Sequence, residues 1–225
     1  TLFSDTMPIL AKGEVLYKGQ PILAIFGPDY ESVNLAARET VIEYEELKSE
    51  STLFDNIKDE EETLLWGDKE ELDLSSLTQV ESTYQSNYTL TNNDTLVKVS
   101  AWFENETLHI SVPTQWTKVL KDNVISSISN QADNVIIHPI PYAADEDEFL
   151  IIPILLSCIV ANAAVKLKAN VEIRANIWAA TPSVTIKHTT FLTEEGKPVG
   201  EEVSYIADEG AFLFEAGEFK RQALT

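Results

Sequence analysis

The chain has 225 residues, of which 44% are hydrophobic, and it carries a net charge of −21 at pH 7. A chain of this length and hydrophobicity can bury a core, as one large domain or two small ones. Its negative charge repels phosphate groups, so we expect it to bind neither nucleic acid nor an anionic membrane. The stretch from Glu39 to Asp73 holds fourteen acidic residues and three lysines, and its simplest interpretation is solubility.

The first predicted elements are two short strands with a helix between them. The apolar run Pro21–Phe26 ends at Gly27, which is typical of a buried strand. Asp29 can cap a helix that extends to about Glu39. The β-branched and aromatic residues of Val41–Glu46 then predict a second strand. These elements form a domain expected at residues 1–50.

An acidic, turn-rich linker is expected at residues 51–77, followed by a domain at residues 78–225. In that domain Val97–Phe103 predicts a strand and Leu108–Val112, in which apolar and polar residues alternate, predicts its hairpin partner. The turn between them is expected at Glu104-Asn105-Glu106. Thr114 is expected to cap a helix with one apolar stripe. The stripe consists of Trp116, Val119, Leu120, Asn123, Val124, Ser127 and Ile128.

The last third of the chain again mixes strands and a helix. Val135–Ile137 predicts a short strand, Leu150–Lys166 an apolar core helix, and Val171–Ile173 another strand. The apolar helix is too short and too polar to span a membrane. A final hairpin is expected from Val184–Phe191 and Glu201–Ile206. The element order therefore predicts the α+β class, with no repeat of fixed period.

The sequence offers few groups for catalysis or metal binding. Cys158 is the only cysteine, which fits a reducing compartment, and we expect a cytoplasmic location. It lies in an apolar run, so a buried inert thiol is favoured over a Cys–His catalytic pair. His109, His138 and His188 lack metal-site spacing and are predicted to be singly exposed or capped, and Asp145–Glu148 is predicted to be a solvated loop. We therefore assign no catalytic residue and no metal ligand.

Aromatic residues are the remaining candidates for a ligand surface. Because most of them lie in patterned elements, packing in the core is the default prediction. The tryptophans concerned are Trp66, Trp102, Trp116 and Trp178.

Two blocks of the chain carry a family pattern. Within Leu16–Leu47, a Gly19-Gln20-Pro21 start precedes an apolar run, a helix with Ala36-Ala37-Arg38, and a Tyr44-Glu45-Glu46-Leu47 end. This block resembles the second part of the α/β hammerhead domain in the large, molybdenum-binding subunit of xanthine dehydrogenases and aldehyde oxidases. Later segments resemble the same subunit. They are Glu81 to Trp102 with Tyr84 and Tyr88 between them, Ser111–Gln115, Trp116–Ile128 and Asp208–Phe212.

The resemblance implies a partial α/β hammerhead unit followed by a molybdopterin-binding-like subdomain of hairpins and packed helices. It also implies an oxidoreductase family, the molybdenum hydroxylases, with molybdopterin as cofactor. The positions near that cofactor differ here: Thr89 stands where the family usually has glutamine, and Pro141–Asp147 replaces a glycine-rich loop. The family's catalytic glutamate lies beyond the last residue of this chain. The residues at family cofactor positions are Thr89, Thr91, Tyr142, Ala143 and Ala144.

We therefore expect a fragment or degenerate relative of a molybdenum hydroxylase large subunit that is non-catalytic and binds no molybdopterin on its own. Its partners would be other subunits of such an enzyme. The chain starts with Thr1 in the middle of a pattern, which also suggests a piece of a longer protein. One alternative is an acidic protein-interaction or assembly module with a basic partner, and another is an enzyme with a separate activity. Neither the substrate nor the oligomeric state follows from the sequence.

Overall fold

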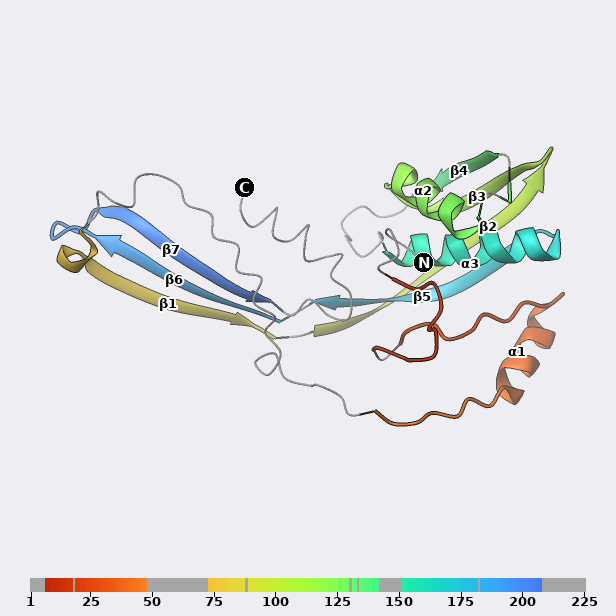
Figure 1. Cartoon of the computed structure of the whole chain (residues 1–225), viewed down its shortest axis with the longest axis horizontal. Coiled ribbons are helices and arrows are strands. Elements are labelled where there is room, and N and C mark those ends of the chain that lie inside the picture. Colours follow the sequence, from red (N-terminus) through yellow and green to blue (C-terminus); the bar gives the residue numbers. More distant parts are fainter. Residues whose placement is uncertain are drawn as a thin grey trace. The chain divides into compact units, whose positions relative to one another are not determined.

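A computed structural model describes residues 7–17, 19–47, 73–87, 89–129, 131–132, 134–141, 151–181 and 183–207 (Figure 1). It contains helices and two sheets, so the α+β class is confirmed. The chain divides into two compact units. The first consists of Thr1–Glu43 and Thr91–Ala179, and the second of Tyr44–Leu90 and Ala180–Thr225. The domain boundaries predicted at residues 50 and 78 stay a prediction.

A four-stranded sheet with the strand order β4-β3-β2-β5 forms the centre of the first unit. Its strands are β2 (Thr89–Glu104), β3 (Thr107–Pro113), β4 (Asn134–Ile140) and β5 (Val171–Thr181). β2 and β3 form the predicted antiparallel hairpin, whereas β3 and β4 are parallel. Figure 1 shows β5 running opposite to β2 along its other edge.

The hairpin turn lies where the sequence predicts it. Asn105 and Glu106 both adopt positive φ, at 47° and 65°. Two consecutive residues of this kind make the turn whose twist matches that of two antiparallel strands. The β2–β3 register is therefore defined by a local turn as well as by the alternating pattern of β3.

Two helices cover one face of this sheet, α2 (Thr117–Ser127) between β3 and β4, and α3 (Ile151–Leu167) before β5. α2 packs against α3 and β4, and α3 packs against β3. α3 is apolar around its whole circumference, as expected for a helix enclosed by protein. The largest fully buried side chains of this core are Leu108, Ile110, Leu120, Ile128, Ile154, Val97, Val99, Val112, Val124 and Val135.

The apolar stripe predicted on α2 is confirmed except at its start. Leu120, Val124 and Ile128 are buried, but Trp116 is 51% exposed, so its predicted burial is wrong. Trp116 precedes the helix with φ −102° and ψ 51°, and it therefore does not follow the helical spacing. Thr114 does not cap the helix either. Its Oγ1 accepts a hydrogen bond of 3.0 Å from the Trp116 N–H, in the turn before the helix.

The helix α1 (Tyr30–Glu39) has the predicted bounds and the predicted cap. Asp29 Oδ1 accepts the Ser32 N–H at 2.8 Å, and this hydrogen bond lowers the pKa of Asp29. The strands expected on either side are wrong, because Pro21–Phe26 and Val41–Glu46 are not strands in the structure. A strand needs a paired neighbour to satisfy its backbone groups, and among the described residues neither segment has one.

The Gly19-Gln20-Pro21 motif has a local structural role. Gly19 has φ 97°, a conformation that glycine adopts without a steric cost. This turn buries the Gln20 side chain, whose Oε1 accepts the Leu16 N–H at 2.7 Å. The motif thus closes a loop through a buried amide.

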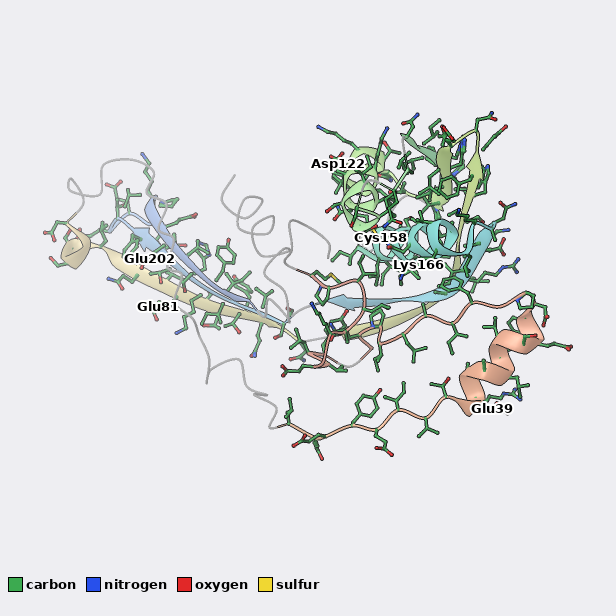
Figure 2. All side chains as sticks on the ribbon, turned by 45° about the vertical axis from the view of Figure 1, so that its right-hand side comes forward. Glu39, Glu81, Asp122, Cys158, Lys166 and Glu202 are labelled. Carbon is green, nitrogen blue, oxygen red and sulfur yellow. The ribbon has the colours of Figure 1, made fainter. Side chains whose placement is uncertain are left out.

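The second unit contains a three-stranded antiparallel sheet in the order β1-β6-β7. Its strands are β1 (Thr78–Ser86), β6 (Val184–Leu192) and β7 (Pro198–Ala207), preceded by the short 3-10 helix η2 (Leu74–Ser76). The hairpin expected in this region, β6–β7, is confirmed. Glu81 and Glu202, labelled in Figure 2, lie on one face of this sheet together with Lys187, Phe191 and Ile206. The other face, called the apolar face below, carries Val80, Tyr84, Ile186, Val203 and Tyr205, together with Ser82, His188 and Glu201.

Candidate functional site

The face of the four-stranded sheet opposite to α2 and α3 carries the most unusual side-chain cluster of the described residues. Leu108, Ile110 and Val112 of β3 point to the helices and are buried. Because side chains alternate along a strand, His109 between them points to the other face. Trp102 is the register partner of His109 on β2, and His138 reaches the same cluster from β4.

The three aromatic rings of Trp102, His109 and His138 are nearly parallel. The Trp102 ring centroid lies 5.4 Å from that of His109 and 5.4 Å from that of His138, with interplanar angles of 13° and 18°. The two imidazole centroids are 5.2 Å apart at 19°. Offset parallel stacking at such distances is favourable for aromatic pairs, so the indole supports both imidazoles.

The two histidines share a hydrogen bond. His109 Nδ1 and His138 Nε2 are 2.9 Å apart. The distance of 5.2 Å between the two imidazole centroids equals the distance between these two nitrogens plus the distance from each centroid to its own nitrogen. The two nitrogens therefore point directly at each other. One ring must therefore donate an N–H and the other must accept it. The second nitrogen of His109, Nε2, lies 4.0 Å from Glu104 Oε2.

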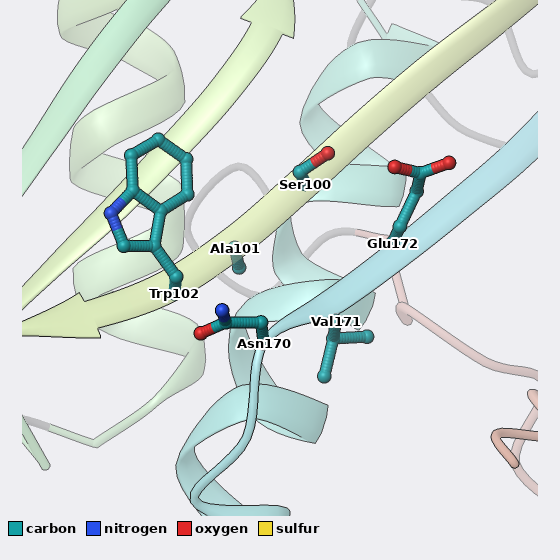
Figure 3. A pocket seen from close by; sticks show the side chains of 6 residues that line it. All are labelled: Ser100, Ala101, Trp102, Asn170, Val171 and Glu172. Atoms are coloured by element: carbon teal, nitrogen blue, oxygen red, sulfur yellow. The ribbon is translucent and has the colours of Figure 1, made fainter. Parts of the chain in front are cut away.

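A shallow hollow lies beside Trp102, between β2 and the start of β5 (Figure 3). Its volume is about 230 Å³, and it is lined by Ser100, Ala101, Trp102, Asn170, Val171 and Glu172. Small-molecule sites usually have about 300–1,000 Å³ and enclose most of the ligand. This hollow is smaller and open, so it does not fit an enclosed substrate site.

Glu172 at the rim of this hollow is held by two cations. Lys98 Nζ lies 2.7 Å from Glu172 Oε2, and Arg174 Nε lies 2.8 Å from Glu172 Oε1. The hydrogen bond from Lys98, with a smaller contribution from Arg174, lowers the pKa of Glu172. The carboxylate is therefore stabilised in its charged form, which makes it a poor general base near neutral pH. Its role is to link β2 to β5.

The described residues do not combine these groups into a catalytic or metal centre. No three His, Cys, Asp or Glu side chains among them come close enough to hold a metal ion. The facing nitrogens of His109 and His138 are already engaged with each other. Cys158 is fully buried in α3 (Figure 2), and burial raises the pKa of its thiol to about 12. The prediction that Cys158 is buried is confirmed.

The residues at family cofactor positions are only partly described. Thr89 and Thr91 both lie in β2, and Tyr142, Ala143 and Ala144 lie outside the described residues. The Asp145–Glu148 segment also lies outside them.

The prediction of isolated histidines is wrong for two of the three. His109 and His138 are paired through the parallel contact of β3 with β4, which brings together residues 29 positions apart. His188 does stand singly in the described structure, half-buried on β6, with its Nε2 3.7 Å from Glu201 Oε2.

The tryptophans likewise depart from the core prediction. Trp102 is half-buried on the open face of the sheet and Trp116 is exposed. The side chains of Trp66 and Trp178 lie outside the described residues. The alternation along β2 could have indicated the position of Trp102, because Val99 and Ala101 are buried on one face of the strand and Trp102 therefore lies on the other.

Comparison with known proteins gives no assignment, since no protein-family model and no curated protein matches the chain. Within the described part of the chain, no helix combines the length and the apolar character that crossing a membrane requires.

Proposed function

We propose that the chain is a non-catalytic segment of the large-subunit type found in xanthine dehydrogenases and aldehyde oxidases. In this proposal it is cytoplasmic, as its single cysteine suggests. It acts by docking its N-terminal segment, Pro21–Leu47, onto another polypeptide of such an enzyme. The observation that carries the proposal is the exposure of apolar side chains around α1.

No residue of α1 is buried. Tyr30 is 80% exposed and Leu35 is 59% exposed. In the extended stretch that follows, Val41 is 83% exposed, and Ile42 and Tyr44 are also exposed. Apolar surface left in water forgoes about 25 cal/mol per Å² of stabilisation, and clusters of such surface commonly mark protein-interaction sites.

The two stretches beside α1 have strand-like composition and lack strand partners among the described residues. A polypeptide that offers a sheet edge could pair with one or both of them, and the backbone hydrogen bonds would then add to the apolar contact. The family resemblance of Leu16–Leu47 names the class of partner, because in that family this block belongs to a larger α/β domain.

The non-catalytic part of the proposal rests on residue chemistry. Thr89 cannot supply the amide of the family's glutamine, and the Pro141–Asp147 sequence has no glycine for close approach to a cofactor. Its acids would also repel the pyranopterin phosphate. The chain alone is therefore proposed to bind no molybdopterin and to hydroxylate neither purines nor aldehydes.

Affinity purification from the native host tests both parts. The tagged chain should co-purify with a polypeptide that mass spectrometry identifies as a molybdenum hydroxylase subunit. Leu35→Glu and Val41→Glu should abolish this, because each places a charge in the apolar contact. Leu167→Glu is the matched control, since Leu167 is 57% exposed at the end of α3. Equal loss in the control would contradict docking through α1.

Metal analysis tests the chain alone. The purified chain, separated from its partner, should contain no molybdenum and show no absorbance of a pterin cofactor. One molybdenum per chain with hydroxylation of a heterocycle would overturn the non-catalytic assignment.

The second candidate is an acidic assembly module with a basic partner. The net charge of −21 and the acids between Glu39 and Asp73 favour it. Its binding would weaken steeply with salt, because exposed charges are screened over about 10 Å at 0.1 M ionic strength. Apolar docking through α1 would be less affected, so the salt dependence of the purified complex separates the two candidates.

A further inference from the structure

The strand β1 is an open edge of the three-stranded sheet, since among the described residues it pairs only with β6. An edge strand exposes unpaired N–H and C=O groups, and proteins commonly blunt such edges with proline, lysine or adjacent charges. The opposite edge, β7, contains Pro198 and the adjacent pair Glu201-Glu202. In the other unit, the edge strand β4 contains Pro139. β1 has nine residues, no proline, glycine or lysine, and a single acid, Glu81.

The sequence of β1 is nearly symmetric in side-chain type about Ser82. Moving outwards from Ser82, Glu81 mirrors Thr83 and the apolar Val80 mirrors Tyr84. The next positions match an amide with an amide and a hydroxyl with a hydroxyl, as Gln79 mirrors Gln85 and Thr78 mirrors Ser86. An antiparallel pair of two such strands would therefore place like chemistry opposite like at the apolar, amide and hydroxyl positions, and would keep the two glutamates apart.

The backbone limits which registers two copies can adopt. Alternate residues of an edge strand direct their backbone groups to the free side. A two-fold axis relating two identical strands must then pass through a residue, not between residues. An axis at Glu81 would put the two Glu81 carboxylates opposite each other, which is unfavourable. An axis at Ser82 avoids this and pairs all nine residues.

We infer that β1 is a homodimerisation edge, at which a second copy of this chain pairs antiparallel to β1 about Ser82. The two sheets then form one continuous six-stranded sheet. A two-fold axis perpendicular to the sheet keeps both apolar faces on the same side. Val80 of one copy lies opposite Tyr84 of the other, twice, and both side chains are exposed in the single chain. Aromatic–β-branched cross-strand pairs of this kind are favourable.

Substitutions of opposite charge at Thr83 are expected to change the affinity of the dimer in opposite directions. In the inferred register, Thr83 of one copy lies opposite Glu81 of the other, so Thr83→Lys creates two attractive pairs and Thr83→Glu creates two repulsive ones. Within a single chain the effects are opposite, because Thr83 is the register partner of Lys187 on β6. A lysine at position 83 repels Lys187, and a glutamate there attracts it. A change that tightens the dimer is thus expected to weaken the β1–β6 pair slightly. General effects on folding cannot imitate this result.

The experiment is sedimentation equilibrium of the full chain over a wide concentration range. Thr83→Lys should lower the dimer dissociation constant about fivefold and Thr83→Glu should raise it about fivefold, from two cross-strand charge pairs. Gln115→Lys and Gln115→Glu are the matched controls, since Gln115 is exposed in the other unit and the net charge changes equally. The combined Glu81→Lys and Thr83→Glu variant should recover the dimer affinity that Thr83→Glu alone loses. In this variant, position 81 of one copy is a lysine that faces the glutamate at position 83 of the other copy.

Salt gives an independent readout. Each copy carries a net charge of −21, so higher ionic strength should strengthen the wild-type dimer by screening the repulsion. The inference is overturned if the wild type and Thr83→Lys are both monomeric at every concentration. It is equally overturned if the position-83 variants shift the dissociation constant no more than the Gln115 controls.

Discussion

Truncation of Leu120 to alanine tests the core between α2, α3 and the sheet. Leu120 is 0% exposed on α2, the helix that packs against α3 and β4. Replacing a fully buried leucine by alanine usually costs about 2–5 kcal/mol, as lost transfer energy and as a cavity. α3 is enclosed and apolar, and Asn162 on it donates a hydrogen bond to Ser127 Oγ of α2 at 3.2 Å. The helices cannot close the cavity freely, so we expect the middle or upper part of that range.

Trp116→Ala is the control that separates the structure from the sequence pattern. Trp116 falls on the same predicted stripe and its side chain is larger, so burial there would make its truncation cost about 3–5 kcal/mol. The structure places it before the helix and 51% exposed. We therefore expect a loss below about 1 kcal/mol. We therefore predict that Leu120→Ala lowers the free energy of unfolding more than Trp116→Ala does.

The measurement is urea unfolding followed by far-UV circular dichroism, with hydrogen exchange at the α2 amides as a local probe. The local probe is needed because a chain with two compact units need not unfold in one step. Leu120→Ala should speed α2 exchange and lower the midpoint without changing the slope. A loss below about 0.5 kcal/mol for Leu120→Ala, or a larger loss for Trp116→Ala, would refute the packing described here.

Three further predictions concern single side chains. His138→Ala should cost about 0.5–1.5 kcal/mol of unfolding free energy by removing the bond to His109, and long-range 15N–1H spectra of the wild type should show one donor and one acceptor nitrogen. Cys158 should react with thiol reagents only after unfolding. Because burial raises the pKa of its thiol from an ordinary value of 9.0 to about 12, its contribution to stability is full below pH 9.0 and falls as pH rises toward about 12. A Cys158→Ala difference that stays constant over that range would contradict this. Glu172→Gln should lower the free energy of unfolding by less than about 1 kcal/mol at pH 7, because the ion pair with Lys98 is exposed. Because the pKa of Glu172 is lowered in the folded state, the difference in stability between wild type and variant should be present above pH ~4.3 and vanish as pH falls through the pKa of the folded state.

Elements with a complete local signal were predictable from the sequence. β3 shows strict alternation, α3 is a long apolar helix, and α1 has a cap residue directly before it, and all three are found in the structure. The two strands expected beside α1 failed for a physical reason. A helix satisfies its own backbone, whereas a strand requires a neighbour, and composition alone does not supply one.

Trp116 shows a second limit of pattern reading. It extends the i, i+4 spacing of Leu120 and Val124 backwards by one turn, so the periodicity includes it. The backbone does not, since Trp116 has ψ 51° and the helix begins at Thr117. The start of a helix depends on dihedral angles and on the turn that precedes it, here built by Thr114. Periodicity therefore predicts the middle of such a stripe better than its end.

The histidine pair required topology as well as pattern. Alternation places His109 on the face of β3 opposite to the core, and it places His138 on the same face of the sheet, opposite to the buried Val135 of β4. Only the parallel pairing of β3 with β4 across the α2 crossover brings the two imidazoles to 2.9 Å. The two facing nitrogens are hydrogen-bonded to each other, and the Trp102 indole stacks on both imidazole rings. The cluster thus joins three adjacent strands on the face of the sheet opposite to α2 and α3.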